Sequence, residues 1–127
     1  MGLDNGIIVK NKTRKELPPW IRYFSEKDYV EGVEICYWRK WWGFRNEIMN
    51  KFATQDDQYY IDLKREDIRA IFYILEWYLK YPEEATHGYW EDNEVRKKIK
   101  VDLWNLFWLY IHMLFHSDTE VYFYDSY

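Results

Sequence analysis

The chain has 127 residues, of which 48% are hydrophobic and 22% aromatic, and its formal net charge is −4. This length suits one domain around one core, residues 1–127, and the aromatic content excludes disordered and collagen-like classes. The negative charge argues against a general affinity for a nucleic-acid backbone, because such binding needs an excess of Lys and Arg over the binding face.

Three features bear on the cellular compartment. Cys36 is the only cysteine, so no intrachain disulfide forms, which favours a reducing, cytoplasmic setting. The first residues lack the basic and apolar regions of an export signal, and Gly6 stands where a myristoylation signal has Ser or Thr. The apolar stretch 101–115 is shorter than about 20 residues and is interrupted by polar side chains, so it is a poor membrane span. We expect a cytoplasmic protein with no membrane segment.

The first half of the chain predicts two strands and a helix. Residues 2–9 end in a β-branched cluster typical of a strand, and residues 10–32, with the pair Pro18-Pro19, indicate an irregular excursion with one short helical turn. Residues 33–38 alternate in the manner of a second strand. A helix over residues 39–53 follows, with an apolar stripe formed by Trp41, Phe44, Ile48 and Phe52.

The second half predicts two helices between two strands. A short strand over 58–61 precedes Asp62, which we expect to cap a helix that runs to Tyr81 and is flanked on two sides. Pro82 ends this helix, and 83–93 is expected to be a surface connection. The last helix opens near Asp92 and becomes apolar nearly all round, which is typical of a central helix, before a final strand over 120–127. The fold class is therefore α+β, with a small antiparallel sheet packed against about three helices.

The segment Tyr-Trp-Arg-Lys-Trp-Trp at 37–42 is the most distinctive in the chain. Its rings can stack on a ligand or build a core, and its cations can hold an anion. Arg39 and Lys40 are expected at the start of a helix, where backbone amides attract anions, although a solvated helix start explains them as well. Trp41 is expected in the core.

Arg45 is the second candidate, because the helical wheel places it inside the apolar arc. A buried guanidinium needs a carboxylate or an anionic ligand, and Asp4 is one candidate partner. The alternative is an arginine that extends to water past Trp42. With Trp38 and Trp42 expected on either side of Arg45, the candidate ligand-binding residues are Asp4, Trp38, Arg39, Lys40, Trp42 and Arg45.

Two further constellations are weaker. His112 and His116 have the spacing that lets two imidazoles share a metal, but no third ligand is evident, and the wet edge of a buried helix explains them more simply. The basic runs at 10–15 and 96–100, with Trp38 and Trp42, are compatible with a single-stranded nucleic-acid groove. No nucleophile motif is visible, and we expect no cofactor.

Met1-Gly2-Leu3-Asp4, Tyr37-Trp38-Arg39-Lys40 and Tyr59-Tyr60-Ile61 occur in an order and spacing that carry a resemblance. Together they resemble an uncharacterised family of small proteins from bacteriophages and bacterial genomes, over about the first two thirds of the chain. The family commonly has a histidine where this chain has Arg45. The resemblance implies a phage or mobile-element origin and, for a phage protein, the host cytoplasm.

Three functions follow as expectations. The first is a non-enzymatic accessory protein that binds a host factor or sequesters a small anionic ligand such as a nucleotide. The second is a single-stranded nucleic-acid module, and the third is a small metal-dependent enzyme that uses His112 and His116.

Overall fold

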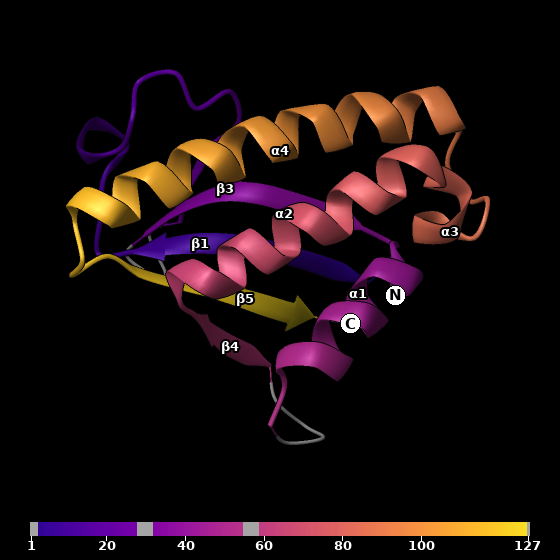
Figure 1. The fold of residues 1–127 in the computed structure, drawn as a ribbon, viewed down its shortest axis with the longest axis horizontal. Coiled ribbons are helices and arrows are strands. Elements are labelled where there is room, and N and C mark those ends of the chain that lie inside the picture. Colours follow the sequence, from indigo (N-terminus) through magenta and orange to yellow (C-terminus); the bar gives the residue numbers. More distant parts are fainter. Residues whose placement is uncertain (1–2, 28–31, 55–58, 127) are drawn as a thin grey trace.

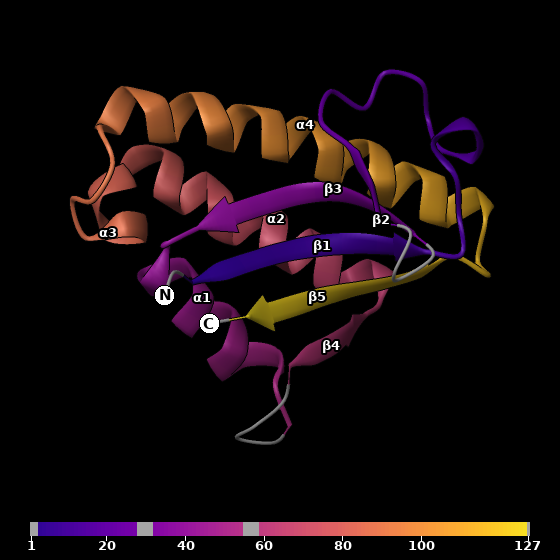
Figure 2. The same ribbon diagram turned by 180° about the vertical axis from the view of Figure 1, so that it is seen from behind.

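The structure is a computed structural model that describes residues 3–27, 32–54 and 59–126. Five antiparallel strands form one sheet in the order β2-β3-β1-β5-β4, and the helices lie against one of its faces (Figures 1 and 2). The expected α+β class is confirmed. The elements are β1 (Asp4–Lys10), η1 (Arg14–Glu16), β2 (Ser25–Lys27), β3 (Gly32–Arg39), α1 (Trp42–Phe52), β4 (Tyr60–Leu63), α2 (Arg65–Lys80), α3 (Pro82–Thr86), α4 (Asp92–Phe115) and β5 (Glu120–Ser126).

The two ends of the chain form the middle of the sheet. β1 pairs with β3 on one side and with β5 on the other, so Asp4 lies opposite both Arg39 and Ser126. β1 thus has a neighbouring strand along each edge, and its residues from Asn5 to Val9 are buried. The expected first and last strands also included Gly2 and Tyr127, which lie outside the described residues. The start of β1 and the end of β5 lie beside α1 (Figure 2).

α2 and α4 form the helical layer and run antiparallel across the sheet (Figure 1). Each buries one stripe of aliphatic side chains, including Ile71 and Leu75 from α2 and Ile99 and Leu106 from α4. The expectation that α4 is a central helix is wrong, because the fold has two layers and no second sheet or helix covers its outer side in the described chain. Phe107 is 46% exposed as a result.

Several boundaries differ from the sequence expectations. β3 continues to Arg39, and Lys40 then adopts a left-handed φ of 61°, so α1 begins only at Trp42. Asp62 lies within β4 and caps nothing, because the chain stays extended to Leu63. The Asp67 carboxylate instead accepts a hydrogen bond from the Lys64 backbone N–H, 2.8 Å away, at the start of α2.

Two elements were not expected at all. Pro82 ends α2 and also opens α3, because proline suits the first position of a helix. Residues 25–27 form the edge strand β2, in which Ser25 pairs with Glu34 of β3. The fourth strand begins at Tyr60, and the expected residue 58 lies outside the described ranges.

In the part of the chain described, no helix is both long and apolar enough to cross a membrane.

Candidate functional site

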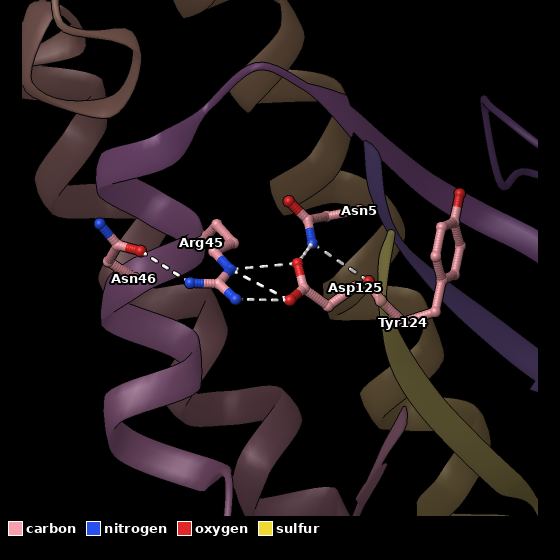
Figure 3. Close-up of polar contacts among 5 residues, drawn as sticks. All are labelled: Asn5, Arg45, Asn46, Tyr124 and Asp125. Atoms are coloured by element: carbon pink, nitrogen blue, oxygen red, sulfur yellow. Dashed lines mark hydrogen bonds and ion pairs between the residues drawn. The ribbon is translucent and has the colours of Figure 1, made fainter. Parts of the chain in front are cut away.

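Arg45 is partly buried and paired with a carboxylate, which is one of the outcomes expected from its position in the apolar arc of α1. Its partner is Asp125 on β5, however, and not the candidate Asp4. The Nε atom of Arg45 lies 3.1 Å from both carboxylate oxygens, and Nη2 lies 2.6 Å from Oδ2 (Figure 3). Such a bidentate pair is among the stronger polar contacts in proteins.

The same network reaches β1 through Asn5, which is 1% exposed. Its side-chain amide donates to Asp125 Oδ1 at 2.7 Å and to the backbone oxygen of Tyr124 at 3.2 Å (Figure 3). Nη1 of Arg45 donates to the Asn46 side chain at 3.0 Å. The guanidinium is therefore committed to groups of its own chain, and Arg45 serves as a tie between α1 and the centre of the sheet.

Asp4 lies on the opposite face of the sheet from this network, because its neighbour Asn5 points toward the helices. It accepts a hydrogen bond from the Tyr37 hydroxyl at 2.6 Å. Burial, with help from this bond, raises the pKa of Tyr37 to about 12. The structure thus separates Asp4 from Arg45.

A pocket of about 250 Å³ lies where β3 ends and α4 begins. Its rings come from Tyr37, Trp38, Trp41 and Trp90, and its charged groups are those of Arg39, Glu94 and Lys98. The Trp90 indole is fixed by a hydrogen bond of 3.2 Å to the Arg39 backbone oxygen. Aromatic rings with charges nearby are features of a site for a planar ligand.

The floor of this pocket is built on a buried carboxylate. Asp102 of α4 is fully buried. Its carboxylate accepts a hydrogen bond from the Trp38 indole at 2.7 Å and forms an ion pair with Lys98. The Lys98 ammonium also lies 5.5 Å from the Trp38 ring centroid, within cation–π range. Burial raises the pKa of Asp102, while Lys98 opposes that rise. Trp38 is therefore immobilised from both its edge and its face.

The lone cysteine contributes to this floor only as a buried group. Cys36 is fully buried and its thiol hydrogen-bonds to Asp102. Burial, together with the Asp102 charge, raises the pKa of Cys36 well above its ordinary value. The thiol is thus held in its unreactive, protonated form.

Arg39 and Lys40 occupy different positions despite being neighbours. Arg39 is exposed at the edge of the pocket and makes no ion pair with any residue of the described chain. Lys40 donates a hydrogen bond of 2.8 Å to the Tyr89 hydroxyl, which lowers the pKa of Tyr89. Arg39 is therefore the cation available to a ligand, while Lys40 closes the turn.

The start of α1 offers less to an anion than its sequence suggested. A Cβ atom added at Gly43 would lie 2.3 Å from the backbone oxygen of Glu84, so the first turn of α1 packs directly on α3. Because the Glu84 carbonyl oxygen lies so close to the first turn of α1, its partial negative charge disfavours an anion near the amides of that turn. An anionic group in the pocket must rely on side chains.

The two histidines at the C-terminal end of α4, His112 within the helix and His116 just after it, do not converge on a common point. The rings of His112 and His116 stack with their centroids 4.2 Å apart and their planes 27° apart, so their ring nitrogens do not aim at one position. Burial, with the nearby His116 and Lys12, lowers the pKa of His112. Among the described residues no group of three or more His, Cys, Asp or Glu side chains is placed to hold a metal.

Of the six candidate ligand-binding residues, the structure brings only Trp38 and Arg39 to one pocket. Trp42 is exposed on α1 and does not line the pocket. Sequence reasoning missed Trp90, Glu94 and Lys98, which meet β3 only through the fold. One signal was present: Lys98 and Asp102 are four residues apart on a helix, the spacing of an ion pair.

No protein-family model, no curated protein and no solved structure matches this chain.

Proposed function

We propose that this protein is a non-enzymatic accessory protein of phage or mobile-element origin that binds a small, flat, anionic ligand of the nucleotide class. The observation that carries the proposal is the pocket between β3 and α4, where aromatic side chains lie beside the Arg39 guanidinium. A base would pack against the Trp90 ring, which is 38% exposed, and its phosphate would meet Arg39. Arginine suits that task because its planar fork of donors matches phosphate geometry.

Charge and size narrow the ligand further. The Lys98 charge is balanced by Asp102, so Arg39, which makes no ion pair with a described residue, supplies the positive charge for the phosphate. Glu94 on the same pocket would repel a bare anion but accepts hydrogen bonds from the ribose hydroxyls or the amino group of a base. The volume of about 250 Å³ is below the range of about 300–1,000 Å³ for drug-sized ligands, which favours a mononucleotide over a larger molecule.

Thermal unfolding with three matched ligand series tests this proposal. Nucleoside monophosphates, including the cyclic ones, are expected to raise the Tm, because a ligand that binds only the native state stabilises it. The corresponding nucleosides should act more weakly, and inorganic phosphate should have no effect. A Tm that no nucleotide raises would refute the assignment.

Variants then locate the binding site. Arg39→Gln should remove the preference for the phosphorylated ligand, and Trp90→Ala should abolish binding of nucleotide and nucleoside alike. Trp20→Ala is the control, since Trp20 is an exposed tryptophan that packs on Trp108 outside the pocket. Equal affinity in Arg39→Gln and the wild type would place the ligand elsewhere.

A further inference from the structure

The outer side of the helical layer carries a second hollow, independent of the pocket at β3. It is a groove of about 350 Å³ between α2 and α4, with Phe72 and Tyr73 on one wall and Phe107, Tyr110 and Ile111 on the other. Tyr73 is 53% exposed and Phe107 46%. Large aromatic side chains on an exposed surface are unusual for a monomer unless that surface binds something.

The groove exists because both helices are more apolar than a two-layer fold requires. α4 buries a stripe that includes Val95, Ile99 and Leu106 against the sheet, yet Phe107 and Leu114 stand outside that stripe. The wide apolar arcs in the sequences of α2 and α4 predicted neighbours on more than one side of each helix. Within the described chain no element lies over this outer side (Figure 1).

Basic side chains lie at both ends of the α2–α4 helix pair that forms the groove, although the chain as a whole carries a formal charge of −4. At one end the Arg65 guanidinium lies 5.9 Å from the Tyr110 ring centroid, and Arg69 lies 5.7 Å from that of Tyr73. At the other end Arg96 donates a hydrogen bond of 3.3 Å to the Leu79 backbone oxygen, close to the exposed Lys80.

Acidic groups offset this charge only in part. Glu66 pairs with Arg65 at 3.7 Å, and Glu76 is exposed midway along α2. The surface thus combines an apolar centre with a mainly basic border. The complementary surface has an apolar centre and an acidic border.

We propose that the groove binds an amphipathic helix of a partner protein, with apolar anchors one turn apart and carboxylates along its flanks. A helix laid between two antiparallel helices would complete a three-helix layer, and its anchors at i, i+4 and i+7 would meet Phe72, Phe107 and Ile111. The flanking carboxylates would meet Arg69 at one end and Arg96 at the other. This interaction does not depend on the nucleotide pocket.

A second copy of the chain fits the same groove less well. In a symmetric dimer the N-terminal end of α2 would meet the C-terminal end of the other α2, which brings Arg65 toward the position of Lys80. Like charges at such contacts disfavour association. The charge pattern therefore favours an acidic heterologous partner.

Selection from a displayed library of helical peptides tests the proposal without a known partner. Peptides of between four and five turns, roughly, would match the length of α2, which has 16 residues, and both apolar and charged positions would be varied. The expected pool carries an apolar stripe flanked by Asp and Glu. A pool with basic or neutral flanks would overturn the proposal.

Calorimetry with the most enriched peptide then locates its binding site. Arg69→Glu and Phe107→Ser are each expected to weaken binding at least tenfold, and an analogue with Lys at the flanks should bind at least tenfold more weakly. Lys51→Glu, an exposed charge reversal on α1, is the control. Because Arg69 is fully exposed, its variant is expected to fold, which circular dichroism checks.

Two other outcomes would also overturn the proposal. One is concentration-dependent dimerisation in sedimentation experiments that Phe107→Ser abolishes, because the groove would then be filled by a second copy. The other is binding of anionic lipid vesicles, but not of the acidic peptide, in a manner that Arg69→Glu abolishes.

Discussion

The Arg45 guanidinium of α1 holds the Asp125 carboxylate of β5 through both Nε and Nη2, at 3.1 and 2.6 Å. The two side chains are 18% and 3% exposed, so a change of Arg45 alone would leave Asp125 buried beside Asn5 without its cation. Arg45→Met is therefore expected to lower the free energy of unfolding by about 3 kcal/mol, the lower end for a broken buried pair because the arginine keeps some solvent.

Urea unfolding of Arg45→Met, Asp125→Leu and the double variant checks this value through a double-mutant cycle. The double variant should regain much of the stability lost in Arg45→Met, because apolar replacement of both members of a buried pair is often close to neutral. Losses that simply add would show that the pair does not act as a unit.

Asp102, which lies beneath the floor of the pocket, makes the stability of the protein depend on pH. Burial raises its pKa above the ordinary 3.8, so the native state holds this proton more tightly than the unfolded state does. Between the two pKa values stability falls as pH rises, and above the folded pKa the full penalty is present.

Asp102→Asn removes this penalty while keeping an acceptor for the Trp38 indole. As the pH rises from about 4, near the pKa of the unfolded state, to about 7, the stability of the variant relative to the wild type should increase. Parallel urea titrations across this range measure the difference. A relative loss with rising pH would mean that the Lys98 pair outweighs the cost of burial.

Tyr37 should ionise only in strongly alkaline solution, because burial and the Asp4 carboxylate raise its pKa to about 12. Its ordinary value is 10.0, so the native state loses stability as pH rises from 10 to about 12. Asp4→Asn removes the negative charge beside the hydroxyl and should lower this pKa. The tyrosinate absorbance difference between wild type and Tyr37→Phe isolates the residue, and an unchanged curve in Asp4→Asn would contradict the assigned cause.

Gly6 in β1 permits the close approach of two side chains on the sheet face away from the helices. A Cβ atom there would lie 2.5 Å from the Tyr124 ring, 2.6 Å from a Glu34 carboxylate oxygen and 2.8 Å from the Cys36 backbone oxygen. Gly6→Ala is expected to cost about 1–3 kcal/mol of unfolding free energy through overpacking.

A second substitution shows which contact matters. Tyr124→Ala in the Gly6→Ala background relieves the ring contact but not the contact with the Cys36 carbonyl, so chemical denaturation should show a smaller added loss than Tyr124→Ala causes alone. Gly6→Ala with wild-type stability would show that these neighbours move aside freely.

Much of the secondary structure could be predicted because it depends on local pattern. The alternation at 33–38 and the apolar stripe of α2 specify a strand and a helix regardless of their neighbours. The boundaries moved where a neighbour intervened. Lys40 lies outside α1 because its backbone N–H donates a hydrogen bond to the Leu3 backbone oxygen, 2.8 Å away. The local sequence pattern around residue 40 does not predict that bond.

Only part of the candidate site could be predicted, because a local pattern shows only residues that are close together in the sequence. Trp38 and Arg39 were expected at a ligand boundary from their ring and charge. Trp90, Glu94 and Lys98 lie more than fifty positions further along the chain, and only the packing of α4 over the end of β3 brings them to the same pocket.

Arg45 shows most clearly how the two kinds of information divide. The sequence by itself indicated that this arginine would either meet a carboxylate or an anionic ligand or extend to water, because the helical period places it in an apolar arc and an unpaired buried charge is too costly. Only the tertiary structure decided which carboxylate. Asp4 and Asn5 are adjacent in β1 and point to opposite faces, so the strand turns Asp4 toward Tyr37, while β5, paired alongside, brings Asp125 to the helical face.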